Sequence, residues 1–423
     1  MASTPAPGGR GPEPVSGLPA ARRSLSVAEY VAELAALLPP DPRSEQVPLD
    51  EALGRVLAEP VTARTANPAF DNSAMDGYAV RFESMTTVPV RLRVVGEVAA
   101  GSADEPVIGA GECVRIMTGA PLPGSADTVV PVEDTDGGVD VVELRRAPVR
   151  RGAHVRLAGE DYPAGVTVAA AGDRLTPGLL GAVAAAGATT VAVRLRPVVA
   201  VCATGDELVA DGSALGRGQL YESNSHVLAA ALRRDGAQVV RGGPVPDQPG
   251  ALAAWLDEAT ATADLVVLTG GASVGSHDVV RDLLTERADG VFRHVRVQPG
   301  KPQGWARWGD VPVVALPGNP LSAALCYEVF VRPLLEQRVQ AAPAATFTAV
   351  AATGWTCPSG RAQLLPVLLE TTPDGRLLAR AAHQRGSASH LVSSLAAADG
   401  IAVVAEEVDR VAEGDPVQVR LLV

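Results

Sequence analysis

The sequence predicts a multidomain α/β protein organised around a central parallel sheet. The chain has 423 residues, which is too many for one core, so roughly two to four domains are expected. Residues 197–337 alternate between short apolar runs and helical patterns, as parallel sheets with right-handed crossovers do. Residues 67–156 and 343–423 instead show short alternating runs separated by Gly and Pro, which is typical of small β domains.

Helices are predicted in the N-terminal part. A capping-box pattern from Ser26 to Glu29 predicts the start of one helix. Thr176, followed by a proline suited to the first helical turn, predicts another helix that ends at Gly187. A further helix is suggested by four apolar residues at helical spacing: Leu49, Leu53, Val56 and Leu57.

The central region is predicted to repeat a strand-then-helix unit. The expected strands are Val198–Ala203, Gln238–Arg241, Leu265–Leu268, Val291–Val297 and Val313–Leu316. The expected helices lie near 225–234, 251–259, 279–284 and 321–335, and a hairpin is expected to turn near Gly309 and Asp310.

These patterns divide the chain into a tail and four domains. Residues 1–23 are rich in Pro, Gly, Ala and Ser and are expected to be disordered. The predicted domains are an N-terminal scaffold (24–69 plus 157–194), an inserted β domain (70–156), an α/β domain (195–338) and a C-terminal β domain (339–423).

Composition excludes several classes of function. The net charge of −12 argues against general binding to nucleic acid or to an anionic membrane. The four cysteines form no C-x-x-C pair, which argues against structural zinc and disulfides and fits a reducing cytosol. The most apolar window, 178–193, is interrupted by Gly and Thr, so no membrane span is expected. We therefore expect a cytoplasmic protein.

A glycine-rich turn follows the strand predicted at Leu265–Leu268. Gly270, Gly271 and Gly275 permit backbone angles closed to other residues, so this turn can aim free N–H groups at an anion. Ser273 and Asp278 flank that point. An ordinary strand-to-helix turn is the alternative, because short glycine patterns have many false positives.

Other loops at the same edge of the predicted sheet carry acids. Glu207, Asp247 and Asp278 follow separate strands and are expected to share one crevice. Three carboxylates repel one another unless a hard cation joins them, and Mg²⁺ bound by carboxylates and a substrate phosphate is the simplest arrangement. Any one of these acids alone is equally well explained as a turn or capping carboxylate.

Two further loops favour an anion. Lys301 lies between Gly300 and Pro302 and is expected to be a fixed cation for a phosphate or an oxyanion, with a solvated surface lysine as the alternative. The run from Pro317 to Ser322 opens a helix, which is a second candidate anion site unless it is a plain proline-rich cap. By itself, Asp76-Gly77 signals only a tight hairpin turn.

Taken together, these motifs resemble the molybdopterin molybdenumtransferase family, which includes bacterial MoeA and the E domain of gephyrin. The resemblance covers roughly residues 24 to 423, in the family's order. It rests on six motifs, at residues 73–79, 115–121, 204–208, 270–275, 299–302 and 317–322.

The resemblance implies an L-shaped homodimer of four-domain subunits. Such a protein would insert molybdenum from molybdate into adenylylated molybdopterin and release AMP, with the help of Mg²⁺. Its central domain would be a three-layer, MogA-like molybdopterin-binding domain, joined to an N-terminal helical unit. A molybdopterin adenylyltransferase is a possible partner.

The resemblance also implies roles for individual residues, by matching position. Those implied to be catalytic are Asp76, Thr118, Glu207, Asp247, Asp278 and Lys301, with Asp76 reaching the partner subunit's crevice and the acids Glu207, Asp247 and Asp278 holding the metal. Those implied to bind substrate are Gly270, Gly271, Ser273, Gly275, Pro299, Pro317, Gly318, Asn319, Ser322, Arg361 and Ser389.

One position departs from the family pattern, and two other functions stay open. Gln298 stands where many members have lysine, which implies weaker molybdate affinity or a paralogue with an altered role. The alternatives are a noncatalytic protein that binds or scaffolds the molybdenum cofactor, and a molybdopterin adenylyltransferase. The acids and Lys301 argue against the first, and the flanking domains with Arg361 and Ser389 argue against the second.

Overall fold

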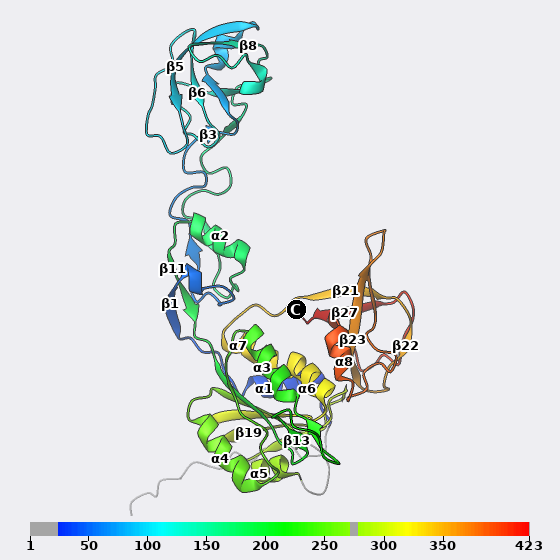
Figure 1. Ribbon diagram of the computed structural model, residues 1–423. Coiled ribbons are helices and arrows are strands. Elements are labelled where there is room, and N and C mark those ends of the chain that lie inside the picture. The colour runs from blue at the N-terminus through cyan, green and yellow to red at the C-terminus, as the bar shows by residue number, and fades with distance from the viewer. Residues whose placement is uncertain (1–23, 271–277, 423) are drawn as a thin grey trace, which may run out of the picture. The chain divides into compact units, whose positions relative to one another are not determined.

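The computed structural model of this chain describes residues 24–270 and 278–422, which form two compact units (Figure 1). One unit is Pro42–Leu195. The other joins the segment that ends at Asp41 to the region from Arg196 onward. No helix among these residues is long and apolar enough to cross a membrane.

A six-stranded sheet forms the centre of the larger unit. The strand order is β15-β12-β16-β20-β19-β17, in which the first four strands are parallel and β19 is antiparallel to both neighbours. The strands are β12 (Val198–Ala203), β15 (Gln238–Arg241), β16 (Leu265–Thr269), β17 (Val291–Arg293), β19 (Gln303–Trp308) and β20 (Val311–Leu316). The predicted hairpin near Gly309 is confirmed, since β19 and β20 pair directly across it.

Helices cover both faces of this sheet (Figure 1). Neighbouring residues of a strand point to opposite faces, so Val199 and Val201 pack with one set of helices and Ala200 and Cys202 with the other. The first set is α1 (Val27–Ala35), α3 (Asn224–Arg234), α6 (Pro320–Cys326) and α7 (Arg332–Arg338). The second set is α4 (Pro249–Thr260) and α5 (Val279–Arg287).

Two central elements differ from the prediction. The run from Val291 to Val297 is not one strand, because β17 ends at Arg293 and β18 (Val297–Gln298) pairs with the C-terminal domain. The predicted helix at 321–335 is present, but a π-helical segment, η4 (Tyr327–Val331), lies between α6 and α7. Periodicity cannot reveal the first change, since β18 forms by pairing with a strand of another domain.

The C-terminal domain is a closed β structure. Strand β23 pairs with both β24 and β25, and β21 and β27 complete the ring. The elements are β21 (Thr346–Ala351), β22 (Trp355–Thr356), β23 (Ala362–Thr371), β24 (Leu377–Ala381), α8 (Val392–Ala397), β25 (Gly400–Val404), β26 (Arg410–Val411) and β27 (Pro416–Leu421). The β18–β23 pairing and an ion pair of 2.7 Å between Arg296 and Glu406 join this domain to the segment that follows β17.

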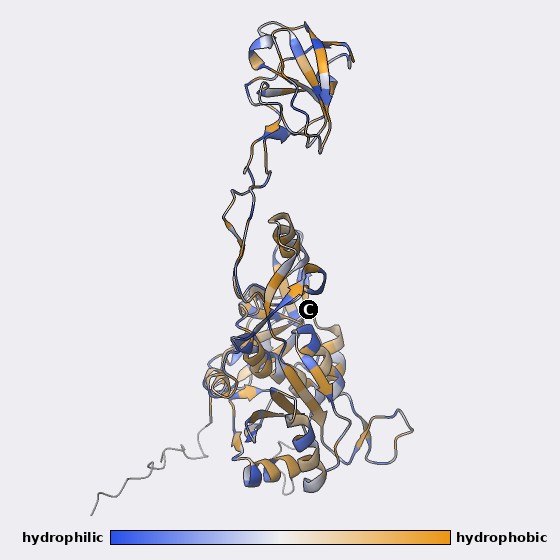
Figure 2. Cartoon of the chain, turned by 90° about the vertical axis from the view of Figure 1, so that its left-hand side faces the viewer, coloured by the Kyte–Doolittle hydropathy of each residue, from blue (hydrophilic) through white to orange (hydrophobic). Residues whose placement is uncertain are grey.

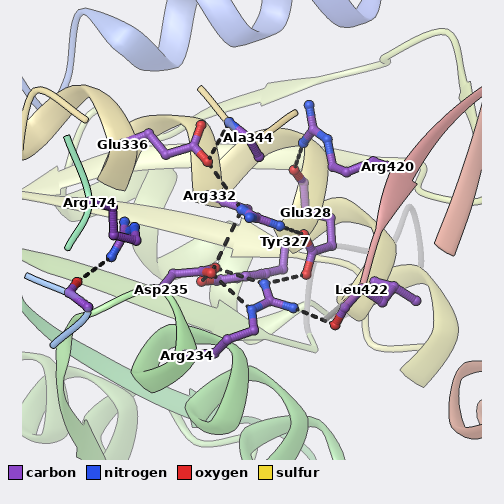
Figure 3. A network of polar contacts seen from close by, with 11 residues as sticks. Arg174, Arg234, Asp235, Tyr327, Glu328, Arg332, Glu336, Ala344, Arg420 and Leu422 are labelled. Atoms are coloured by element: carbon purple, nitrogen blue, oxygen red, sulfur yellow. Dashed lines mark hydrogen bonds and ion pairs between the residues drawn. The ribbon is translucent and has the colours of Figure 1, made fainter. Parts of the chain in front are cut away.

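A buried ionic network also ties the two domains together (Figure 3). Glu328 in η4 accepts hydrogen bonds from Arg234 at 2.7 Å and from Arg332 at 2.9 Å. Arg234 also donates to the carbonyl of Leu422, and Arg420 in β27 donates to the carbonyl of Glu328. The helices on one face of the central sheet are therefore fixed to the last strand of the chain.

The smaller unit contains less helix than predicted. One part of this unit consists of the pairs β1–β11 and β2–β10 with one α-helix: β1 (Ser44–Pro48), β2 (Val61–Thr62), β10 (Thr167–Ala169), α2 (Pro177–Ala185) and β11 (Thr190–Arg194). The helix suggested from Leu49 to Leu57 is wrong. Only a 3₁₀ turn, η1 (Leu49–Glu51), forms there, because Gly54 takes a φ of 72° and Leu57 bridges to Val193.

The region predicted as an inserted β domain consists mainly of β-strands. Its five-stranded sheet has the order β7-β4-β6-β5-β8, and hydrophobic and hydrophilic residues both occur along its strands (Figure 2). The strands are β3 (Asn72–Ser73), β4 (Gly77–Val80), β5 (Val90–Val98), β6 (Glu112–Ile116), β7 (Thr128–Pro131), β8 (Val141–Leu144) and β9 (Val155–Arg156). Short 3₁₀ turns, η2 (Phe82–Met85) and η3 (Val132–Asp134), join them.

Candidate functional site

A cavity of about 890 Å³ lies at the carboxyl ends of the central strands. Loops that follow β12, β16 and β20 line it, as expected where loops from several parallel strands converge. The C-terminal domain contributes Arg361 and the segment from Ser387 to His390. The cavity therefore combines residues from two domains of the same compact unit.

Gly270 allows the loop after β16 to approach the loop after β12. Its φ is 97°, and a Cβ atom there would lie 2.4 Å from the carbonyl oxygen of Thr204. Only glycine fits this close approach. Gly271, Ser273 and Gly275 lie outside the described residues, so their predicted roles stay predictions.

Three predicted acids line the cavity, in different environments. The side chains of Glu207 and Asp247 are exposed, and desolvation followed by repulsion from Asp206 and Glu207 raises the pKa of Asp247. Asp278 is only 6% exposed and accepts a hydrogen bond of 3.0 Å from the backbone N–H of Arg281, as the N-cap of α5.

These acids share a cavity without surrounding a common point. Across residues 24–270 and 278–422, no group of three or more His, Cys, Asp or Glu side chains converges closely enough to hold a metal ion. The capping role of Asp278 explains part of this, because one of its oxygens is directed at its own helix. Glu207 and Asp247 interact, since the negative charge of Glu207 contributes to raising the pKa of Asp247.

Two cations face the same cavity. Burial lowers the pKa of Lys301, and the positive charge of Arg361 lowers it further. The residue before this lysine must be glycine. Gly300 has a φ of 129°, and a Cβ atom there would lie 2.5 Å from Cys326 Sγ. Lys301 is also the only lysine in the chain; every other cationic side chain is arginine. Pro299 lines the cavity beside it.

The loop that opens α6 is joined to the C-terminal domain. The amide of Asn319 donates to the hydroxyl of Ser389 at 2.9 Å, and the backbone N–H of Leu321 donates to the carbonyl of Ser389 at 3.1 Å. The helix start is thus partly occupied by protein rather than fully open to an anion. Pro317, Gly318 and Ser322 line the cavity, and their predicted role in substrate binding stays a prediction.

Several lining residues were missed by the sequence reasoning. Glu222 is buried and accepts hydrogen bonds from the backbone and hydroxyl of Ser225, and Asn224 donates from its amide to Thr269 and Gly318. Both follow the short strand β14 (Leu220–Tyr221), which pairs with β13 (Leu208–Val209). Their polar character directly before a predicted helix was the signal in the sequence that could have revealed them.

Gln298, the position that departs from the family pattern, lines the cavity. It pairs with Gln363 in register.

Asp76 and Thr118 belong to the smaller unit, where they contact one another. Asp76 accepts hydrogen bonds from the backbone N–H of Thr118 at 2.7 Å and from its hydroxyl at 2.8 Å. These two bonds lower the pKa of Asp76, and Arg115 contributes less. The hairpin turn suggested at Asp76-Gly77 is wrong, since the strand β4 that begins there pairs with β6 and β7.

The fold and the cavity define a multidomain α/β protein with a cavity, lined by acidic and basic side chains, at the carboxyl ends of its central strands. Family models agree with this division. The MoeA N-terminal region (domain I and II) matches residues 25–187, a probable molybdopterin binding domain matches 200–337, and the MoeA C-terminal region (domain IV) matches 348–422.

Individual relatives show the family. Molybdopterin molybdenumtransferase 2 of Mycobacterium tuberculosis is 41% identical over 393 residues, which cover 88% of this chain and 94% of the relative. Molybdopterin molybdenumtransferase of Nostoc is 38% identical over 302 residues, covering 70% of this chain and 69% of the relative. The chain belongs to the molybdopterin molybdenumtransferase family, whose members are transferases of molybdenum cofactor biosynthesis.

Solved structures agree with the architecture. The molybdopterin biosynthesis MoeA protein of Pyrococcus horikosii superposes with a TM-score of 0.73 at 30% identity, covering 94% of this chain and 99% of that one. A second structure of the Pyrococcus horikoshii MoeA protein gives a TM-score of 0.79 at 25% identity, covering 94% and 100%. The chain therefore has a MoeA-like multidomain structure.

Proposed function

We propose that this protein inserts molybdenum from molybdate into adenylylated molybdopterin and releases AMP. The observation that carries this proposal is a single cavity that holds both an acidic pair, Glu207 and Asp247, and a cationic pair, Lys301 and Arg361. A substrate with phosphates, together with a separate oxyanion, needs both kinds of group. The cavity volume of about 890 Å³ suits a ligand of that size.

The cationic groups suit molybdate. Molybdate is a tetrahedral dianion, and Lys301 and Arg361 would neutralise it while hydroxyls orient it. Ser322 and Ser389 both line the cavity. The hydroxyl of Ser389 accepts its hydrogen bond from Asn319, so its own hydrogen remains to be donated to an oxyanion. Positioning, rather than an added reactive group, would account for most of the catalysis.

The acidic groups suit a hard cation. The acids in this part of the cavity offer only oxygen ligands, and Mg²⁺ is held in proteins by one or two carboxylates, with waters and substrate phosphates completing its shell. Glu207 and Asp247 fit that description, and Asp278 lines the same cavity. When bound, Mg²⁺ would supply positive charge at the phosphates and so favour the departure of AMP.

The protein itself supplies no thiolate. All four cysteines are buried and free, and burial raises the pKa of Cys113 and of Cys326 to about 12. Burial also raises the pKa values of Cys202 and Cys357. At neutral pH these thiols are protonated, so the sulfurs that bind molybdenum would be those of the pterin substrate.

A homodimer in the cytoplasm completes the proposal. Asp76 and Thr118 would act in the cavity of a partner subunit, and a molybdopterin adenylyltransferase would supply the substrate. Adenylylation by this protein itself is the second candidate. The presence of Arg361 and Ser389 in the cavity favours metal insertion, because an adenylyltransferase has no need of a second oxyanion site.

Release of AMP from purified adenylylated molybdopterin with Mg²⁺ tests the proposal. We expect release that depends on molybdate and no consumption of ATP. Binding of the substrate without release of AMP at any molybdate concentration would contradict metal insertion. ATP turnover with unmodified molybdopterin, in the absence of molybdate, would favour the adenylyltransferase instead.

A further inference from the structure

The amide of Asn224 is fixed in one orientation at the lining of the cavity. Its Nδ2 donates to Thr269 Oγ1 at 2.7 Å and to the carbonyl oxygen of Gly318 at 2.7 Å. The carbonyl can only accept, so a nitrogen must face it. Thr269 donates its own hydrogen to the carbonyl of Pro317 at 3.2 Å, so it too must accept from Asn224. Both amide hydrogens are therefore used.

This arrangement leaves a buried acceptor. Asn224 Oδ1 is buried and has no hydrogen-bond partner among the residues that the structure describes. Nearby in the lining, Thr204 is 5% exposed, and its Oγ1 also has no partner within residues 24–270 and 278–422. A buried polar atom without a partner costs free energy, so two in one cavity point to a ligand that completes them.

The chemistry of the two atoms specifies the ligand group. Asn224 Oδ1 can only accept a hydrogen bond, whereas the hydroxyl of Thr204 can donate one. We infer that Asn224 and Thr204 recognise the amino-bearing edge of a nitrogen heterocycle, with Asn224 accepting from the amino group and Thr204 donating to a neighbouring ring nitrogen or carbonyl. The identity of that heterocycle rests on the proposed function, in which the substrate carries both a pterin and an adenine.

Tyr221 supplies a complementary surface. Its ring lines the cavity and is 54% exposed, and its hydroxyl donates to the carbonyl of Ser213 at 3.1 Å. An aromatic ring anchored in this way stacks well on a planar heterocycle. The segment from Tyr221 to Asn224 thus presents a stacking face and a polar contact within four residues.

Equilibrium binding of matched ligands tests the inference without turnover. One pair is AMP and purine riboside 5′-monophosphate, which lacks the amino group. The other is 6-carboxypterin and 6-carboxylumazine, in which a carbonyl replaces that group. For the wild-type protein we expect the amino-bearing member of one pair to bind about tenfold more tightly, the value of one hydrogen bond. In Asn224→Ala this preference should disappear.

The two ligand pairs also identify the heterocycle. Preference in the pterin pair alone assigns the site to the pterin, and preference in the nucleotide pair alone assigns it to the adenine.

Controls separate recognition from folding. Asn67→Ala removes an asparagine that lies outside the cavity and whose amide contacts Asp161, and it should keep the preference for the amino group. Thr204→Val keeps the shape of the side chain and should lower the affinity for both members of the recognised pair. A wild-type protein without preference in either pair, or an Asn224→Ala variant that keeps it, would overturn the inference. Preference without AMP release in the transferase assay would instead contradict the proposed function.

Discussion

The hydroxyl of Ser389 lies 2.9 Å from the amide nitrogen of Asn319, and this bond joins the C-terminal domain to the loop that opens α6. The carbonyl of Ser389 is bound as well, by the backbone N–H of Leu321. The hydroxyl and the carbonyl of Ser389 are thus both hydrogen-bonded to the central domain. The contribution of the C-terminal domain to the cavity is fixed by these contacts together with the β18–β23 pairing.

Ser389→Ala is predicted to weaken molybdate binding by roughly 10- to 100-fold, since a hydrogen bond to a charged group contributes about 1.5–3 kcal/mol. Calorimetric titration of molybdate measures the change. Ser393→Ala is the matched control, because Ser393 is exposed and absent from the cavity lining. Equal affinity in the wild type and Ser389→Ala would remove this hydroxyl from the anion site.

Much of the central domain was predictable from the sequence, for a physical reason. Strands buried on both faces have continuous apolar runs, so β12 and β16 were located to within a residue, and the loops after them mark the cavity. The edge strand β15 is largely exposed, and it was located from the alternation of strands and helices. Glu207, Asp247, Asp278, Lys301 and Ser322 do line one cavity.

The remainder depended on long-range contacts. The pairing of β18 with β23 joins residues far apart in sequence, and no local pattern encodes it. Asn224 was missed because its significance comes from Thr269 and Gly318, which lie 45 and 94 residues away. The metal site predicted from Glu207, Asp247 and Asp278 stays a prediction, and the capping of α5 by Asp278 is a further contact that the sequence did not reveal.

The single lysine gives a direct probe of the anion site. Burial and Arg361 lower the pKa of Lys301, so its positive charge is lost at a lower pH than for an ordinary lysine. Anion affinity should therefore fall as pH rises toward the ordinary lysine value of about 10.4. In Arg361→Ala the repulsion is removed, the pKa rises, and this decline should move to higher pH, although affinity is lower throughout.

Nitrogen-15 labelling of lysine measures this pKa, because the chain contains one side-chain ammonium group. A pKa that is unchanged or lower in Arg361→Ala would contradict the close approach of the two cations. Lys301→Arg keeps the positive charge but replaces a compact ammonium with a planar guanidinium. We expect this variant to bind molybdate more weakly than the wild type and more tightly than Lys301→Ala.

Asp76 is predicted to make stability of the inserted β domain depend on pH. Its pKa is lowered by the donors of Thr118, so its stabilising contribution is present above the ordinary carboxyl value of about 3.9 and is lost as pH falls through the lowered pKa. The difference in Tm between wild type and Asp76→Ala should be largest near neutral pH and shrink in acid. Asp76→Asn keeps a hydrogen-bond acceptor for Thr118, so its Tm near neutral pH should fall less than that of Asp76→Ala. A difference that grows in acid would contradict the assignment.

Gly270→Ala is predicted to destabilise the protein by about 1–3 kcal/mol, because the residue has a positive φ and its Cβ would overlap the carbonyl of Thr204. Denaturant unfolding monitored by circular dichroism gives the value. Gly250→Ala is the control, since Gly250 lies in α4 with open space at its Cβ, and it should stabilise by about 0.4–1 kcal/mol. Similar effects from the two substitutions would argue against close packing at Gly270.

The stoichiometry of the transfer reaction tests the central claim most directly. Adenylylated molybdopterin, Mg²⁺ and molybdate are incubated with the protein, and AMP released is compared with molybdenum retained on the isolated pterin. We predict one molybdenum incorporated for each AMP released, with both lost together in Asp247→Asn and neither changed in Asp374→Asn, whose carboxylate is exposed and outside the cavity. Release of AMP without incorporation of molybdenum would contradict the account.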